Sequence, residues 1–383
     1  MAISRRALLR QMAATGVAAA AVPSWPGTAL ASSRSQAEEP SSAAGLIRLD
    51  RTVNAYGPSV KVAAAVYEAA ARIANGDASV AAQSLRARIA TAHGVKPDRV
   101  IVGCGSGEVL RLAVEAYAGP RRKIVAAVPT SELIEDIAER AGAEIAAVPL
   151  DERYGHDLDA MLARADASVG LVYICNPNNP TGTLTRRQAI EEFVRRLPSD
   201  VRVLIDEAHH HYVDGSRDYA SFLDRPVDDP RVIVVRSFSN VYGLSGLRVG
   251  YGVATPATVR SLSGIQLPDS VNAVGSAAAI AALEDTEHVQ RSVTRNVDDR
   301  QELLNEASIR MLRVIDSQTN FVMLDTDRPA PLVIEHFRTN GIAIAGFFPY
   351  FAKYIRVSVG TPDEMREFWR VWDLMPRQNR MSM

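Results

Sequence analysis

The sequence predicts an α/β protein in which three layers, αβα, surround a mostly parallel sheet, with a smaller α+β domain at the C-terminal end. Short apolar runs typical of buried strands alternate with helical patterns, and glycine-rich or polar residues follow several of these runs. Continuous apolar strands that alternate with helices are typical of parallel sheets covered on both faces. In such sheets the carboxyl ends of the strands carry the ligand site.

Each element is predicted from its own local pattern. Apolar spacing and flanking residues predict helices over 60–74, 79–93, 107–118, 132–142 and 186–197. Apolar, β-branched runs predict strands over 99–103, 123–128, 145–149, 169–175 and 201–206. After about residue 285, a long polar helix and a strand-helix-strand-strand-helix pattern predict the smaller domain. We therefore expect a large domain over 46–285 and a small domain over 286–383, which the segment 46–58 joins in space.

Composition excludes several classes of function. The 383 residues carry 43 basic and 44 acidic side chains, and the formal net charge is -1. This balance is not that of a polybasic nucleic-acid-binding protein, nor of an electrostatic membrane anchor. Two cysteines, Cys104 and Cys175, cannot form a disulfide framework, and we expect both to be small buried residues at strand ends.

The N-terminus has the pattern of an export signal. Arg5 and Arg6 precede a short apolar stretch over 12–22, and a small-x-small sequence ends at Ala31. The apolar stretch is too short to span a bilayer, so stable membrane insertion is not expected. Paired arginines in this setting indicate a twin-arginine signal peptide over 1–31, followed by a disordered linker over 32–45. The sequence thus predicts a periplasmic or secreted protein and the twin-arginine export machinery as a partner.

Polar residues at the predicted strand ends form a candidate ligand site. A helix that starts directly after a strand can hold an anion with its free backbone N–H groups. The residues that could build such a cup are Gly105, Ser106, Gly107, Ser237, Ser239 and Arg248. Asn179 lies in a loop where its side chain could bond a ligand oxygen. Asp206 ends an apolar strand, where a carboxylate needs either a helix cap or a buried cation as its partner.

Six sequence blocks in this order resemble the fold-type I pyridoxal-phosphate enzymes, most closely the histidinol-phosphate aminotransferase branch. The blocks are 54–58 (NAYGP), 102–108 (VGCGSGE), 176–182 (NPNNPTG), 204–208 (LIDEA), 237–251 (SFSNVYGLSGLRVGY) and 356–361 (RVSVGT). The resemblance covers about residues 46–375. It implies a homodimeric aminotransferase-like transferase that binds pyridoxal 5'-phosphate or pyridoxamine 5'-phosphate and acts on a small molecule.

The resemblance also implies roles for the matching residues. The candidate anion cup is similar to the family's cup for the cofactor phosphate, and Tyr56 resembles the tyrosine that reaches this phosphate from the neighbouring subunit. Asp206 resembles the carboxylate that keeps the pyridine nitrogen protonated, and Asn179 the residue that bonds the ring hydroxyl. Arg356 is similar to the clamp on the substrate's acidic group. Asn54 and Ser131 are expected beside the substrate.

Three residues around the expected ring depart from the family pattern. Asn240 stands where the family has the lysine that bonds the cofactor and shuttles a proton, and an amide can do neither. His209 replaces a tyrosine, and Ser131 replaces the aromatic residue that stacks on the ring. We expect His209, with an ordinary imidazole pKa, to act as the base. Lys353, close to Arg356, is a weaker candidate to substitute for the missing lysine.

Several hypotheses about function stay open at this point. A metal site built from Asp206, His209 and His211 is unfavourable, because consecutive residues of an extended segment point to opposite faces, and no metal is predicted. The leading hypothesis is pyridoxal-phosphate-type chemistry on a small amino acid or amine without a covalent lysine–cofactor bond, by a transferase or a lyase that carries out a half-reaction or an elimination rather than ordinary transamination. The alternatives are a cofactor-independent enzyme, for example for a cyclisation or condensation, and a non-catalytic protein that binds an amino-acid-like or phosphorylated ligand.

Overall fold

The computed structural model describes residues 45–72, 78–213, 215–224 and 229–376. The expected signal peptide over 1–31, and all of the expected linker except Gly45, lie outside the described residues. Among the helices in these ranges, none has both the length and the apolar character that crossing a bilayer requires.

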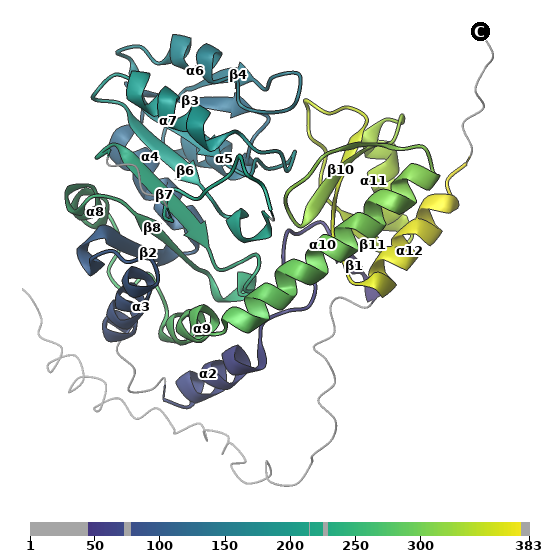
Figure 1. Cartoon of the computed structure of the whole chain (residues 1–383), viewed down its shortest axis with the longest axis horizontal. Helices are drawn as coiled ribbons and strands as arrows, with labels where there is room; N and C mark the ends of the chain where they lie inside the picture. The colour runs from purple at the N-terminus through teal and green to yellow at the C-terminus, as the bar shows by residue number, and fades with distance from the viewer. Residues whose placement is uncertain (1–44, 73–77, 214, 225–228, 377–383) are drawn as a thin grey trace, which may run out of the picture. The chain divides into compact units, whose positions relative to one another are not determined.

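The described residues form a seven-stranded sheet with the strand order β2-β8-β7-β6-β5-β3-β4 (Figure 1). The strands of this sheet are β2 (Val100–Cys104), β3 (Lys123–Val128), β4 (Ile145–Pro149), β5 (Val169–Cys175), β6 (Arg202–Asp206), β7 (Val232–Ser237) and β8 (Val249–Val253). Neighbouring strands from β7 to β4 pair in parallel. The prediction of a mostly parallel sheet is confirmed, with one exception: β8 runs antiparallel to both of its neighbours.

Helices cover both faces of this sheet. Side chains alternate along each strand, so each face presents its own apolar cluster to the helices packed on it. In β5, Val172 and Ile174 belong to one apolar cluster, whereas Leu171 and Tyr173 belong to the other. The first cluster includes residues of α2 (Val60–Ala71), α3 (Ala78–Ala92), α6 (Leu158–Arg164), α7 (Arg187–Arg196) and α9 (Ala273–Glu284). The second includes residues of α4 (Ser106–Tyr117), α5 (Glu132–Arg140) and α8 (Pro256–Ser263). The expected αβα layering is therefore present.

The C-terminal part begins with the long helix α10 (Thr286–Ile309), seen in green in Figure 1. The elements that follow it are β9 (Arg313–Ile315), β10 (Phe321–Asp325), α11 (Ala330–Thr339), β11 (Ile342–Ile344), β12 (Tyr354–Ser358) and α12 (Pro362–Asp373). β12, β10 and β9 form an antiparallel sheet. The short strand β9 was not anticipated in the sequence pattern. β1 (Ile47–Leu49) pairs in parallel with β11, so the start of the described chain lies in this C-terminal part.

Local sequence signals explain where these helices begin. Thr361 and Glu364 form a reciprocal capping box at the start of α12, with Pro362 in its first turn. Asn272 caps α9 by accepting a hydrogen bond from the backbone N–H of Gly275 at 2.6 Å. Helix α4 differs, because its N-cap is Gly105 and no side chain caps it. The backbone N–H groups at the start of α4 thus remain available to a ligand.

Candidate active site

The predicted anion cup comes together because β8 is antiparallel. Cys104, at the end of β2, pairs with Val249, at the start of β8, and Ser237, at the end of β7, pairs with Gly250. The end of β2, the start of α4 and the end of β7 therefore meet at one edge of the sheet. The hydroxyl of Ser237 accepts a hydrogen bond from the backbone N–H of Ser239 at 3.0 Å.

Arg248 reaches the start of α4, and the local backbone leaves room only for glycine. Gly105 has φ +77, and a Cβ added there would overlap the Nη2 atom of Arg248. A Cβ on Gly250 would overlap the backbone nitrogen of Ser106. Arg248 itself is exposed, has φ 54, and donates a hydrogen bond from Nη1 to the backbone oxygen of Ser245 at 2.9 Å. A guanidinium held against open backbone N–H groups forms a cradle for an oxyanion.

Asp206 lies buried at the end of β6 without the cation or helix cap that its position led us to expect. Its carboxylate accepts hydrogen bonds from the Tyr173 hydroxyl at 2.9 Å and from the backbone N–H of Ala208 at 3.0 Å. Desolvation by burial raises the pKa of Asp206, and these two hydrogen bonds oppose that rise. A buried carboxylate held by neutral donors alone can still accept a cationic partner from a ligand.

A cavity of about 370 Å³ opens beside these strand ends. Arg356 of β12 lines it, donating from Nη1 to the Oδ1 atom of Asn179 at 2.7 Å and from Nη2 to the backbone oxygen of Asp50 at 3.2 Å. The guanidinium also lies 5.4 Å from the ring centroids of Phe321 and Phe348. Burial lowers the pKa of Arg356 to about 10. Among the described residues Arg356 forms no ion pair within 4.0 Å, although the carboxylates of Glu132 and Asp50 also line the cavity and oppose the lowering of its pKa.

Asn240 and Ser131 also line this cavity, and Asn240 is only 6% exposed. The Nδ2 atom of Asn240 donates to the backbone oxygen of Ala208 at 2.8 Å. Its Oδ1 atom lies 3.5 Å from the Thr52 hydroxyl, a long contact. Ser131 stands directly before α5 and makes no side-chain cap there. The structure thus brings Asn179, Ser239, Asn240, Ser131 and Arg356 around one cavity.

His209 is buried next to this group, and its pKa differs from the near-neutral value that we expected. Its ring packs edge-on against Phe321 with centroids 5.1 Å apart. Burial, with a smaller contribution from the charge on Arg356, lowers the pKa of His209 to about 3. His209 is therefore a neutral imidazole at any ordinary pH, and its Nδ1 atom is buried without a hydrogen-bond partner.

Other predicted site residues lie away from the cavity. The side chain of Asn54 connects distant parts of the chain. Its Nδ2 atom donates to the backbone oxygen of Val241 at 2.9 Å and to the hydroxyl of Ser292 at 3.0 Å. Tyr56 donates to Asp299 of α10 at 2.6 Å, and burial raises its pKa to about 12. Lys353 is exposed and pairs with Asp327 at 2.7 Å, which raises its pKa.

The cysteine and histidine motifs also take definite positions. Cys104 is exposed, contrary to the expectation for both cysteines, whereas Cys175 is buried. His210 and His211 contact tyrosine hydroxyls, those of Tyr219 at 3.0 Å and Tyr242 at 3.1 Å. Within the described ranges, no group of three or more His, Cys, Asp or Glu side chains is arranged to hold a metal ion.

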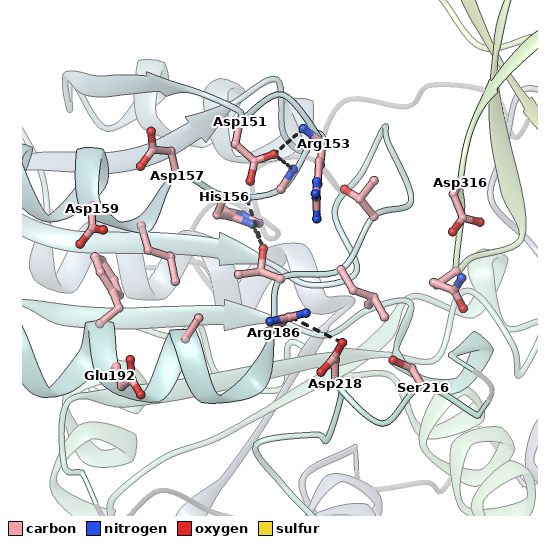
Figure 2. A pocket seen from close by; sticks show the side chains of 18 of the residues that line it. Asp151, Arg153, His156, Asp157, Asp159, Arg186, Glu192, Ser216, Asp218 and Asp316 are labelled. Atoms are coloured by element: carbon pink, nitrogen blue, oxygen red, sulfur yellow. Dashed lines mark hydrogen bonds and ion pairs between the residues drawn. The ribbon is translucent and has the colours of Figure 1, made fainter.

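A larger cavity, of about 1120 Å³, lies elsewhere, around the loop after β4 and the start of α7 (Figure 2). Several of its charged side chains pair with one another. Arg186 lies 3.5 Å from Asp218, and Arg196 lies 2.8 Å from Asp159. None of the residues predicted for the site lines this cavity. The smaller cavity is lined by five of them, whereas Gly105, Ser106, Gly107, Asp206, His209, Ser237 and Arg248 line neither cavity.

The fold and the anion cup define an aminotransferase-type α/β protein, and comparison with known proteins agrees. The profile of the aminotransferase class I and II family matches residues 45–371. The chain belongs to this family. The family prediction and the fold prediction are thus confirmed.

Individual relatives point to one branch of the family. The chain is 36% identical over 329 residues to a histidinol-phosphate aminotransferase 2 of Carboxydothermus hydrogenoformans, covering 85% of this chain and 90% of that protein. It is 34% identical to a histidinol-phosphate aminotransferase of Moorella thermoacetica, covering 85% and 84%. The structure matches the histidinol-phosphate aminotransferase of Sinorhizobium meliloti in complex with pyridoxal-5'-phosphate, with TM-score 0.79, 26% identity, and coverage of 86% and 92%. These relatives are enzymes, in agreement with the expectation that this chain is one.

Sequence reasoning missed several residues that shape the site. Thr52, Asp50 and Glu132 line the smaller cavity, and Tyr173 donates to Asp206. Tyr173 belongs to an apolar strand whose pattern predicts a core residue, so no local signal indicates that its hydroxyl bonds Asp206. Thr52 precedes the matched block 54–58 by two residues, which is the one signal that could have drawn attention to it.

Proposed function

We propose that this protein carries out pyridoxal-phosphate or pyridoxamine-phosphate chemistry on a small amino acid or amine, without a covalent lysine–cofactor bond. The observation that carries the proposal is Arg356, a desolvated guanidinium that lines the cavity and forms no close ion pair among the described residues. A carboxylate from a ligand would supply that counterion and form a paired, charge-assisted contact. The anion cup at the start of α4, of which Ser239 also lines this cavity, gives a second, separate place for an anion.

The residues present fit the cofactor. The cradle made by Gly105, the start of α4 and Arg248 admits no Cβ at Gly105, and it offers N–H groups and a guanidinium to a phosphate. Asp206 would hold the ring nitrogen, since it is buried and has only neutral donors as partners. Asn179, fixed by Arg356, would bond the ring hydroxyl, as its counterpart does in the family. When bound, the cofactor ring withdraws electrons from the reacting carbon of the substrate.

The chain's own side chains would bind and orient the reactants. Arg356 holds the carboxylate of the substrate, and Asn179 keeps the guanidinium in place. His209 is the side chain to which we assign proton transfer, because burial keeps its imidazole neutral and its Nδ1 atom is buried without a hydrogen-bond partner. Asn240, placed by the resemblance at the family's lysine position, would neither bond the cofactor nor move a proton.

The experiment is an absorbance spectrum of the mature protein after incubation with each cofactor form and desalting, repeated with a panel of amino acids. We expect a retained band that shifts with an amino acid. We also expect no cofactor bonded to the chain after borohydride reduction and mass spectrometry. Covalent attachment at Lys61, Lys96, Lys123 or Lys353 would contradict the lysine-free proposal. Unaltered turnover in His209→Phe would remove the role of His209.

A non-catalytic binding protein is the second candidate, and the pKa of His209 favours it. An imidazole with a pKa of about 3 is a weak base. Arg356 and the anion cup would still capture an amino-acid-like or phosphorylated ligand. Thermal stabilisation by ligand without turnover would identify this candidate.

We further propose a homodimer that is exported through the twin-arginine route. Tyr56 lies against α10 in its own chain and does not reach the cavity there, which leaves room for a role at the partner's site. Light scattering would test the dimer. Cell fractionation of the wild-type protein and an Arg5→Lys/Arg6→Lys variant would test the export and the periplasmic location.

A further inference from the structure

The side chain of Asn240 is held in one orientation. Its Nδ2 atom donates to the backbone oxygen of Ala208 at 2.8 Å. A flipped amide would place its Oδ1 against this carbonyl oxygen, and two acceptors would then face each other. Oδ1 must therefore point away from Ala208, toward Thr52.

The Oδ1 atom of Asn240 keeps unused acceptor capacity. Within the described part of the chain, it receives one hydrogen bond, from the Thr52 hydroxyl at 3.5 Å, at the outer limit for such a bond. An amide oxygen has two lone pairs, so a stronger donor can still bind there. Asn240, Thr52 and Asn179 all line the cavity of about 370 Å³, so a ligand in this cavity can reach this oxygen.

We infer that Asn240 makes this site select the amine form of the cofactor, pyridoxamine phosphate, over the aldehyde form, pyridoxal phosphate. The inference rests on the proposed function. By the resemblance in sequence, Asn240 stands where the family's lysine bonds the reactive carbon of the cofactor. The two forms differ only in the group on that carbon, so this side chain decides between them.

The chemistry of the two groups gives the selectivity its direction. An aldehyde oxygen only accepts hydrogen bonds, so it would meet Oδ1 of Asn240 as acceptor against acceptor. A protonated amine is a donor with a positive charge, and its hydrogen bond to an amide oxygen is of the stronger, charge-assisted kind. A lysine at this position would reverse the preference, because it would capture the aldehyde by a covalent bond.

The charges around the cavity do not oppose a cationic amine. Arg51 and Arg356 line it, but so do Asp50 and Glu132. The lining thus carries as many carboxylates as cations, although Asp50 also pairs with Arg48 at 2.6 Å. The preference for the amine then depends on the local contact with Asn240.

The test uses titration calorimetry on the mature protein. It measures the dissociation constants of pyridoxamine phosphate, pyridoxal phosphate and pyridoxine phosphate. All three compounds share the phosphate and the ring, so the ratios of their dissociation constants report the effect of the group on the reactive carbon alone. We expect pyridoxamine phosphate to bind about tenfold more tightly than pyridoxal phosphate, a difference typical of one charge-assisted hydrogen bond. The alcohol, which can donate without a charge, should fall between them.

Two variants and a matched control localise the effect. Asn240→Leu removes the acceptor and should bring the ratio close to one. Asn240→Lys should reverse it, with pyridoxal phosphate retained through desalting and fixed to the chain by borohydride. Asn305→Leu makes the same chemical change on the exposed face of α10 and should keep the wild-type ratio. If Asn240→Leu fails to fold, the lysine variant and the wild-type ratio still decide.

The outcomes separate the inference from the function on which it rests. Equal or tighter binding of pyridoxal phosphate by the wild-type protein overturns the selectivity and leaves the proposed function standing. An unchanged ratio in Asn240→Leu also overturns the role of Asn240. Failure of all three compounds to bind overturns the selectivity and the proposed function together.

Discussion

The two cavities of this protein differ in size and in how their charges are balanced. The larger one, about 1120 Å³, is lined by charged side chains of which several pair with each other, as Arg196 does with Asp159 at 2.8 Å. The smaller one, about 370 Å³, holds Arg356, which has only neutral hydrogen-bond partners within the described part of the chain. Paired charges need nothing from a ligand, whereas an unpaired, desolvated cation does. Charge balance therefore locates the candidate site better than volume.

The strongest test of this comparison is Arg356→Ala. We expect it to lower the affinity of the cofactor-loaded protein for amino acids by about 100-fold, since a charge-assisted contact in a desolvated site is lost. Calorimetric titration with the amino acid that binds most tightly gives the measurement. Arg196→Ala, in the larger cavity, removes an exposed ion pair and should change the affinity by less than about twofold. Equal effects of the two variants would remove the distinction between the cavities.

Gly105→Ala tests the anion cup. The alanine Cβ would overlap Nη2 of Arg248 at a residue with φ +77, so the guanidinium has to move and the backbone is strained. We expect about tenfold or more weaker binding of inorganic phosphate, and a loss of about 1–2 kcal/mol in the free energy of unfolding. Gly246→Ala, where an added Cβ meets nothing within 4 Å, is the matched control. Phosphate binding unchanged by Gly105→Ala would place the anion elsewhere.

Thr185→Val probes the larger cavity, where we expect an effect on stability alone. Thr185 contacts the Nδ1 atom of the buried His156 at 2.7 Å and accepts from its backbone N–H at 3.2 Å. The loss of these two hydrogen bonds should lower the free energy of unfolding by about 1–2 kcal/mol, measured by urea denaturation, and should leave amino-acid binding unchanged. Thr91→Val, on an exposed helix turn, should cost less than about 0.5 kcal/mol. A loss of amino-acid binding in Thr185→Val would give the larger cavity a part in ligand recognition.

The smallest expected effect concerns stability in acid. Buried histidines near both cavities lower this stability. Burial lowers the pKa of His156 to about 4 and that of His209 to about 3, below the value of about 6.5 for an unfolded chain. As the pH falls, the unfolded chain takes up these protons first. Stability is therefore complete above about pH 6.5 and declines as the pH falls toward 4 and 3. His156→Gln should lower the midpoint of acid unfolding by about half a pH unit. A midpoint that does not move would mean that His156 is not buried as a neutral group.

The sequence predicted the parts of the site that depend on strand ends. Strand boundaries follow from local apolar runs, and parallel strands bring their carboxyl ends to one edge. Gly105, Asp206 and Ser237 were therefore foreseeable as neighbours. The antiparallel direction of β8 was not predicted, although it brings Arg248 to Gly105, because strand direction depends on pairing between distant segments.

Other parts of the site depend on tertiary contacts that leave no local pattern. The pKa of His209 follows from burial against Phe321 and from the charge of Arg356, which come from a distant part of the chain. The same holds for Asn54, whose side chain bonds Val241 and Ser292. The resemblance to the family suggested ligand contacts for both.

The antiparallel strand β8 also sets the order in which the protein can be completed during synthesis. Among the described strands, β2 lies at the edge of the sheet and β8 is its one neighbour. While the ribosome makes the segments that follow β2, this strand has no partner, and the anion cup lacks Arg248. Phosphate binding would therefore report, in a series of stalled nascent chains, the moment at which residues 249–253 enter the sheet. The step that closes the sheet is also the step that creates the cradle.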